Sequence, residues 1–162
     1  MNAPGPIPGI TIRPTVLEDL EEILIHRRRM FYDMGHRDEA VLDAMVRSSR
    51  PAMERYLREL TYFGWFALTP DGRIAAGAGL LLMPLVSGPL HPDKIERAYF
   101  LNVYTYPEFR KRGLARALTQ KAIDWCRENQ FKILWLHASN EGRPIYESLG
   151  FKATNEMKLV IE

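Results

Sequence analysis

Residues 98–116 read A-Y-F-L-N-V-Y-T-Y-P-E-F-R-K-R-G-L-A-R, an apolar run followed by a basic run around a single glycine. Its first part, Ala98 to Thr105, is rich in apolar and β-prone residues, which predicts a buried strand. From Leu114 to about Glu128 apolar residues recur at helical spacing, which predicts an amphipathic helix. A strand that turns into a helix through glycine leaves the first N–H groups of the helix without acceptors, where the helix dipole adds partial positive charge. The stretch therefore predicts a backbone anion site around Gly113.

The basic run within this stretch is compatible with three kinds of surface: a nucleic-acid patch, a solvated helix face, or the rim of a phosphate pocket. Lys and Arg total 22 against 20 Asp and Glu, so the net charge is only +2 and the whole chain is no general polyanion binder. Gly113 and Ala115 are small enough to let a phosphate reach the backbone. Neither a nucleotide P-loop nor a G-x-G-x-x-G fingerprint is present. These observations favour a phosphate-bearing small ligand over a polymer.

The rest of the chain predicts one mixed α/β domain that covers residues 1–162, with residues 1–9 as a flexible lead-in. We expect, in order, strand 10–13, helix 16–30 capped by Thr15 and Glu18, and helix 38–60 with a break or kink near Arg50, before Pro51. Then follow strands 62–68, 74–83 and 98–105, helix 114–128, strand 133–137, helix 141–149 that Gly150 ends, and a closing strand over 152–161. The run His26 to Arg29 is expected to be an exposed helix end.

The composition is that of a folded protein, with 46% hydrophobic and 26% charged residues. A single cysteine, Cys126, excludes an internal disulfide, suits a reducing compartment, and lies on the apolar face of its helix, where we expect a core residue. No apolar stretch approaches the roughly 20 residues that span a bilayer. We therefore expect a cytoplasmic protein without a membrane partner.

Three motifs together resemble a known family. Arg110-x-x-Gly113-x-Ala115 is preceded by Val103-x-Thr105-x-Pro107 and followed by the segment I-Y-E-S-L-G-F at 145–151. This combination is similar to the GNAT superfamily of acetyl-coenzyme A dependent N-acetyltransferases. The resemblance implies an α/β fold whose central sheet is mixed, mostly antiparallel, splayed at the acetyl-CoA site and flanked by helices.

The resemblance also implies roles for the matched positions. The backbone of Val103 and Thr105 would pair with the pantetheine arm, and Arg110 occupies the family's Gln/Arg position. The pyrophosphate would be cradled by the amides of Lys111, Arg112, Gly113, Leu114 and Ala115. Tyr146 would lie near the thioester sulfur as the candidate general acid, because a phenol of pKa near 10 is still protonated at neutral pH. Where the family often has asparagine, seven residues before this tyrosine, the chain has Ser139 followed by Asn140, and either could contact the pantetheine.

The sequence does not identify the general base, for which His137, Glu96 and Asp33 are candidates. Phe31 and Asn102 are candidates for substrate binding, and Asn102 could equally be a structural bridge inside its strand. No cluster of His, Cys, Asp and Glu has metal-ligand spacing, so we expect no metal.

These observations predict an acyltransferase that moves an acetyl group from acetyl-CoA to a primary amine by direct attack in a ternary complex. The sequence does not decide whether the acceptor is a small molecule or a peptide amine. It also does not decide whether the chain forms a homodimer. Two other functions remain as alternatives: a (acyl-)CoA-binding module without turnover, and a nucleic-acid-binding domain, although we expect no nucleic-acid partner.

Overall fold

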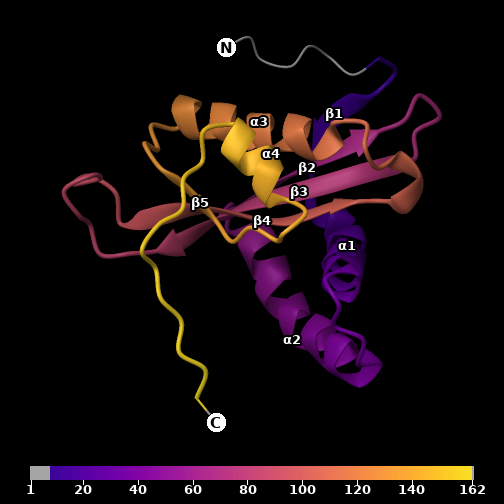
Figure 1. Cartoon of the computed structure of the whole chain (residues 1–162), viewed down its shortest axis with the longest axis horizontal. Helices are drawn as coiled ribbons and strands as arrows, with labels where there is room; N and C mark the ends of the chain where they lie inside the picture. The colour runs from indigo at the N-terminus through magenta and orange to yellow at the C-terminus, as the bar shows by residue number, and fades with distance from the viewer. Residues whose placement is uncertain (1–7, 162) are drawn as a thin grey trace.

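The computed structural model describes residues 8–161, and it contains one five-stranded sheet with helices on both faces (Figure 1). Residues 1–7 of the expected lead-in lie outside the described part, and residues 8 and 9 form a turn. The strands are β1 (Thr11–Pro14), β2 (Tyr62–Leu68), β3 (Ile74–Pro84), β4 (Glu96–Thr105) and β5 (Leu134–Leu136). The helices are α1 (Leu20–Asp33), α2 (Glu39–Arg58), α3 (Leu114–Glu128) and α4 (Arg143–Ser148). A 3-10 turn at Leu17–Asp19 precedes α1, and another at Pro107–Phe109 precedes α3.

The sheet is mixed, as the sequence predicts. Its strands follow the order β1-β2-β3-β4-β5; the first four are antiparallel to their neighbours and β5 is parallel to β4. The parallel pairing is short, because it runs only from Ala98 opposite Leu134 to Phe100 opposite Leu136. After Phe100, no described strand lies on that side of β4. The two strands therefore part at Phe100, and the second half of β4 has one open edge.

A β-bulge interrupts β4 just after this point. Leu101 is opposite Gly79 and Tyr104 is opposite Gly77, so that Asn102 and Val103 together face a single residue of β3. Asn102 has a φ of 56°, an uncommon value for a residue with a side chain. The bulge lies just after the point where β4 separates from β5, and a bulge bends the strand that carries it.

Each face of the sheet has its own core (Figure 1). Helices α3 and α4 cover one face, where Phe100, Leu118 and Tyr146 are buried in one cluster. Helices α1 and α2 cover the other face, where Leu24, Met53 and Phe66 are buried. Cys126 belongs to the first cluster, and its burial raises the pKa of the thiol to about 11. The cysteine is therefore a core residue, as expected.

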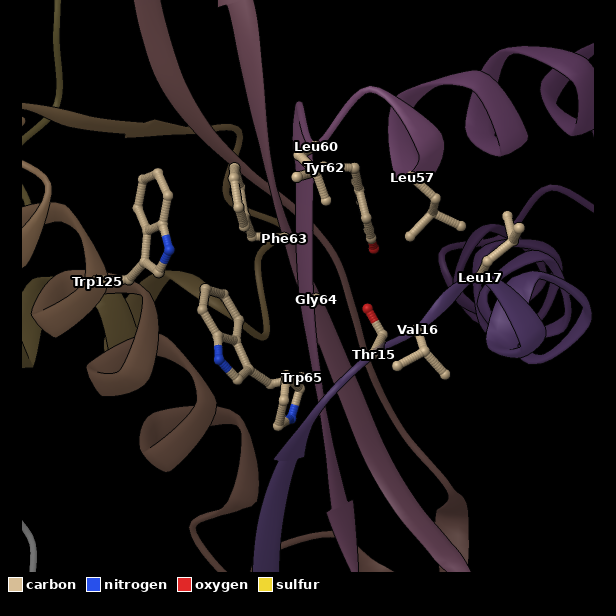
Figure 2. A pocket seen from close by; sticks show the side chains of 11 residues that line it. Thr15, Val16, Leu17, Leu57, Leu60, Tyr62, Phe63, Gly64, Trp65 and Trp125 are labelled. Carbon is tan, nitrogen blue, oxygen red and sulfur yellow. The ribbon is translucent and has the colours of Figure 1, made fainter.

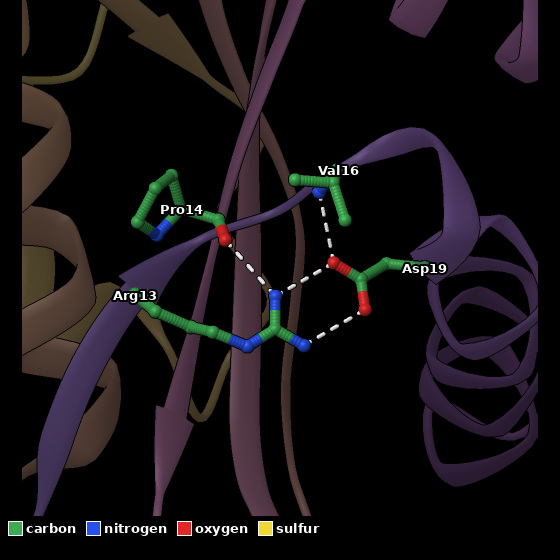
Figure 3. A network of polar contacts seen from close by, with 4 residues as sticks. All are labelled: Arg13, Pro14, Val16 and Asp19. Atoms are coloured by element: carbon green, nitrogen blue, oxygen red, sulfur yellow. Dashed lines mark hydrogen bonds and ion pairs between the residues drawn. The ribbon is translucent and has the colours of Figure 1, made fainter.

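The start of the first helix is capped differently from our expectation. The Thr15 hydroxyl makes no hydrogen bond to a described residue, and its backbone N–H donates instead to the Gly64 carbonyl, 2.9 Å away. Asp19 takes the capping role: its carboxylate accepts the Val16 N–H at 2.8 Å and binds the Arg13 guanidinium through both oxygens (Figure 3). The prediction of a Thr15–Glu18 capping box was wrong, because the Thr15 backbone is hydrogen-bonded to Gly64 of β2 instead.

Two further details of the helices differ from the expectations. His26 is not at an exposed end, since α1 continues to Asp33 and His26 is 1% exposed. Of the break or kink expected near Arg50, the break is absent, since α2 runs through Pro51. A proline inside a helix removes only one backbone donor, and packing of Leu42, Met53 and Leu57 on the sheet holds α2 in one piece.

The closing strand predicted over residues 152–161 is absent. The described part of this segment has no regular secondary structure and is exposed, and it runs past β5 and away from the body (Figure 1). Gly150, at a φ of 94°, ends α4 in the left-handed conformation as expected, and Phe151 still packs against the core.

Candidate functional site

The predicted anion site lies between β4 and α3, in a turn held in an unusual backbone conformation. Gly113 precedes the first residue of α3 with a φ of 75°, and Lys111 has a φ of 60°. No atom lies within 4 Å of the position where a Cβ of Gly113 would stand, so it is the backbone angle that requires glycine here. The side chains of Arg110, Lys111 and Arg112 are exposed around it.

The turn leaves backbone donors free at the helix start. The first hydrogen bond of α3 runs from the Ala117 N–H to the Gly113 carbonyl at 3.0 Å. The N–H groups of Leu114, Ala115 and Arg116 precede this bond and have no acceptor inside the helix. Open donors, a positive dipole end and a glycine that leaves room in front of them fit a phosphate group.

Arg110 joins this turn to the opposite layer of the molecule. Its Nε donates to the Thr105 carbonyl at 3.0 Å, and its guanidinium forms an ion pair with Asp33 at the end of α1. Asp33, one of the candidates for the general base, is thus already paired with a cation. Arg116 faces another neighbour, because its guanidinium donates to the Ser148 hydroxyl at the end of α4.

Tyr146 lies where β4 and β5 separate. Its ring is 8% exposed and makes an edge contact with Phe100, the last β4 residue paired with β5, at 6.4 Å between ring centroids. Phe151 makes a second edge contact at 5.8 Å. Burial raises the pKa of Tyr146 to about 12, so the phenol keeps its proton throughout the neutral range.

The two candidates for a pantetheine contact differ in their surroundings. The Ser139 hydroxyl oxygen accepts the Gly142 N–H at 3.1 Å, and the Ser139 carbonyl accepts the Arg143 N–H at 2.9 Å, so this residue holds the turn that leads into α4. Its hydroxyl proton remains available to donate to a ligand. Asn140 is exposed.

His137 lies on the face of the sheet opposite Tyr146. It directly follows β5, is exposed, and its Nδ1 is hydrogen-bonded to the Tyr99 hydroxyl. Phe100 packs on the α3 face, so its strand neighbour Tyr99 points to the other face. Glu96, the remaining candidate for the base, is the first residue of β4 and lies four residues before the separation point.

The two candidates for substrate binding lie near α1. Asn102 is 4% exposed, and its side-chain carbonyl accepts a hydrogen bond from Arg27 at 2.8 Å while its amide faces the Tyr62 hydroxyl at 3.5 Å. These contacts favour the structural alternative, a bridge between α1 and two strands. Phe31 is half-buried near the end of α1, stacked under the Arg27 guanidinium and beside His36.

A cavity of about 360 Å³ lies away from this site, at the far edge of the sheet (Figure 2). It opens where β1 stops pairing with β2, and Phe63, Trp65 and Trp125 line one side while Val16 and Leu57 line the other. It contains neither the turn at Gly113 nor Tyr146 and offers few polar groups. The cavity is therefore separate from the candidate site at the β4–α3 turn and the separation of β4 from β5.

A comparison with protein-family models matches residues 20–151 to the acetyltransferase (GNAT) family. The chain belongs to the GNAT acetyltransferase family. This range contains the turn at Gly113, the open edge of β4 and Tyr146, so the family and fold predicted from the sequence are confirmed. The family is one of acyltransferase enzymes that use acetyl-CoA.

Individual relatives agree with this membership. The chain is 33% identical over 101 residues to the [ribosomal protein bS18]-alanine N-acetyltransferase of Escherichia coli K12, a match that covers 60% of the chain and 56% of that relative. A GCN5-related N-acetyltransferase from Ralstonia eutropha JMP134 is 35% identical, with a TM-score of 0.87 and coverage of 94% and 99% of the two chains. An acetyltransferase from Clostridium acetobutylicum, crystallised with acetyl-CoA, shares the fold at 22% identity and a TM-score of 0.81 over 94% and 96% of the two chains.

Sequence reasoning missed a buried polar cluster under the β4 end of this GNAT domain. His26 Nε2 lies 3.1 Å from Glu22, whose carboxylate also accepts the Tyr106 hydroxyl at 2.6 Å. Burial lowers the pKa of His26 to about 4. The sequence did hold a signal for the burial of His26, because this residue follows Ile23 by three positions and so shares the apolar face of its helix.

Within residues 8–161 no helix is long and apolar enough to cross a membrane. In the same range, no three side chains of His, Cys, Asp or Glu gather in a way that could hold a metal ion.

Proposed function

We propose that this GNAT domain transfers the acetyl group of acetyl-CoA directly to a primary amine. The observation that carries the proposal is the turn at Gly113, which leaves backbone donors of α3 open shortly after the half of β4 that β5 does not pair. Acetyl-CoA supplies a thioester, which an amine can attack without a covalent enzyme intermediate. The residues of the chain bind acetyl-CoA and the amine, orient them for attack and move the protons.

The binding residues divide the cofactor between two backbone surfaces. The N–H groups from Lys111 to Ala115 hold the pyrophosphate, with Arg112 and Lys111 adding charge at the rim. The open edge of β4 at Val103 and Thr105 accepts the pantetheine as an added strand would be accepted. Ser139 donates its hydroxyl proton to the same arm, because its oxygen is already engaged by Gly142.

The reaction needs two proton transfers, one to the departing thiolate and one from the amine, and we assign one to each face of the sheet. Tyr146, protonated because of its burial, donates to the departing thiolate on the α3 side. His137 is the base that we favour for the amine, because Asp33 is paired with Arg110 and Glu96 lies at the far end of β4. The hydrogen bond between Tyr99 and His137 Nδ1 orients the ring. In the tautomer whose Nδ1–H donates to the Tyr99 hydroxyl oxygen, Nε2 is the atom that accepts the proton.

The acceptor that we propose is a peptide N-terminus. The E. coli relative at 33% identity acts on the alanine of a ribosomal protein. Surface for an acceptor is present on the α1–α2 side of the sheet, where His137 is exposed and Phe31 is half-buried. An amino terminus is also less basic than a lysine side chain, which lets a histidine deprotonate it near neutral pH.

The experiment is a thiol-release assay with acetyl-CoA and a panel of amines, in which mass spectrometry identifies each acetylated product. We expect turnover with peptides that bear a free N-terminus and little with matched peptides whose only amine is a lysine side chain. Gly113→Glu should abolish turnover because it adds a negative charge beside the proposed phosphate position and strains the left-handed backbone of the turn. No thiol release with any amine, while acetyl-CoA still binds, would instead support the binding module.

The base is tested by the pH profile. His137→Gln should lower kcat by about 100-fold near pH 7 and by less at higher pH, where the free amine is abundant. Tyr99→Phe is the matched control for ring orientation and should cause a smaller loss with the same shape. A His137→Gln profile parallel to wild type would exclude His137 as the base.

A further inference from the structure

A cation on α1 lies close to the opening of the sheet without a carboxylate beside it. Arg27 is half-buried, and none of the ion pairs formed within residues 8–161 includes it. Burial lowers the pKa of its guanidinium, because the charged form loses part of its hydration. Charged side chains that leave water are normally paired, since an unpaired charge is costly to bury. Within the described part of the chain, Arg27 thus has no counter-ion.

Other arginines on the same elements differ from Arg27. Those of α1, β4 and the turn after β4 that bind carboxylates of the chain are Arg28 with Glu39, Arg97 with Glu156, and Arg110 with Asp33. Arg29, also on α1, is exposed and keeps its hydration. Among these arginines, Arg27 alone combines burial with the lack of an acidic partner.

Two contacts fix the direction of the Arg27 guanidinium. Its Nη1 donates to the side-chain oxygen of Asn102 at 2.8 Å, and its central carbon lies 5.0 Å from the centroid of the Phe31 ring. Asn102 belongs to the bulge of β4, two residues after Phe100, where β5 stops pairing with β4. Helix α1 packs against β4 on this face of the sheet (Figure 1). The guanidinium is therefore held beside the open half of β4.

The Arg27 guanidinium keeps donors that the fold does not use. Its Nε is buried and makes no hydrogen bond to a described residue. A guanidinium carries five N–H donors in one plane, of which Asn102 accepts one at Nη1. The two terminal nitrogens can present parallel N–H groups to both oxygens of a carboxylate. A carboxylate therefore matches both the charge and the unused donors of Arg27.

We propose that Arg27 binds a carboxylate that the acceptor carries close to its amine. This inference rests on the proposed function and narrows it, because the acceptor becomes a peptide N-terminus whose second residue is Asp or Glu. The distance fits, since Arg27 touches Asn102 on the open half of β4 and one residue of extended chain spans about 3.5 Å. The main-chain carboxylate of a free amino acid offers the same chemistry, so the experiments include both sources.

The first test compares kcat/KM for acceptors that differ only in this carboxylate. One pair consists of C-terminally amidated peptides that begin with Ala-Asp or Ala-Asn, and the other of alanine and alaninamide. Wild type should prefer the acidic peptide by about 10- to 100-fold. Arg27→Gln should bring this ratio close to one, and Arg27→Lys, which keeps the charge without the planar pair of donors, should retain part of it. Arg28→Gln, which alters the next residue of α1, is the matched control and should keep the ratio of wild type.

The ratio does not depend on how much of a variant is folded, because both members of a pair are measured on one preparation. A preference for alanine over alaninamide that Arg27→Gln removes would assign the site to the main-chain carboxylate. Two outcomes would overturn the proposal: a wild type that shows no preference for the acidic member of either pair, or a preference that persists in Arg27→Gln.

The second test observes the site without turnover. The protein is saturated with CoA, which has no acetyl group to transfer, and the same acceptor pairs are added while the arginine Nε–H signals are recorded by 1H–15N NMR. The signal of Arg27, assigned by its absence in Arg27→Lys, should shift with the acidic member of a pair and stay in place with its amide. The absence of thiol release with every amine would count against the proposed function, yet this spectrum would still decide the carboxylate site. Equal shifts with both members, or none with either, would reject that site even in an active enzyme.

Discussion

At the scale of the residue, the environment of Tyr146 determines how its hydroxyl can act. The sequence identified the residue through the motif around it, but only the fold reveals that it is buried against Phe100 at the opening of the sheet. Burial raises its pKa to about 12, which makes the phenol a proton donor over the whole working range.

This environment predicts a pH profile. The kcat of the wild type should have no descending limb between about pH 7 and pH 10, since the phenol keeps its proton there. Tyr146→Phe, which retains the ring in its contact with Phe100, should lower kcat by about 100-fold with little change in KM. Steady-state kinetics over this pH range measures both. A descending limb near pH 9 that disappears in the variant would contradict the raised pKa.

His26 carries a second prediction, this time for stability. Its folded pKa of about 4 is below the ordinary value of 6.5, so the folded state binds fewer protons than the unfolded chain between these values. The contribution of His26 to the free energy of unfolding is therefore fully present above about pH 6.5. It is lost as the pH drops toward 4, by about 3 kcal/mol at most. Urea unfolding at pH 7.5 and pH 5 measures the loss.

The control for this effect is His26→Leu, which keeps an apolar side chain among Phe66, Tyr104 and Tyr106. The variant should lose less stability between the two pH values than wild type does. An equal loss in both proteins would assign the acid sensitivity to other groups.

At the scale of the element, the sequence predicted the strand, turn and helix from 98 to 128 because every local signal there agrees. Apolar periodicity, glycine and the basic run all support one backbone path, and the structure follows it from Glu96 to Glu128. The predictions failed where a tertiary partner overrides a local signal. Thr15 pairs its backbone with β2, and Asp19 binds Arg13 as well as the cap. The residues that Thr15 and Asp19 contact cannot be identified from the sequence pattern around the helix start.

The uninterrupted α2 has a measurable consequence. Pro51 is exposed within the helix and cannot donate a hydrogen bond to the carbonyl one turn earlier. Pro51→Ala should raise the free energy of unfolding by about 1 to 3 kcal/mol, because it restores that bond without changing a packed side chain. Chemical denaturation gives the value, and Val41→Ala on the exposed face of the same helix serves as the control. A destabilised Pro51→Ala would mean that the proline preorganises a required bend.

At the scale of the whole molecule, the candidate site depends on contacts between layers that are distant in the sequence. Arg110 beside the anion site binds Asp33 of α1, and Tyr106 at the end of β4 binds Glu22 of the same helix. The sequence could assign a role to Arg110 through the family motif, but not its partner, because the two residues meet only in the folded chain. These contacts link the turn at Gly113 and the end of β4 to helix α1 on the other face.

This linkage predicts one cooperative unfolding transition that acetyl-CoA shifts as a whole. At a concentration of about 100 times its Kd, a ligand that binds only the folded state stabilises it by about 2.7 kcal/mol, which should raise Tm by about 5 to 10 °C for a chain of this size. Differential scanning calorimetry with and without acetyl-CoA measures the shift. Gly113→Glu should keep a single transition and lose the shift, whereas Tyr146→Phe should retain most of it, because binding rests on the backbone donors of α3. Two transitions, of which acetyl-CoA moves only one, would show that the cofactor turn and the α1–α2 layer unfold independently and that the contact of Arg110 with Asp33 does not couple them.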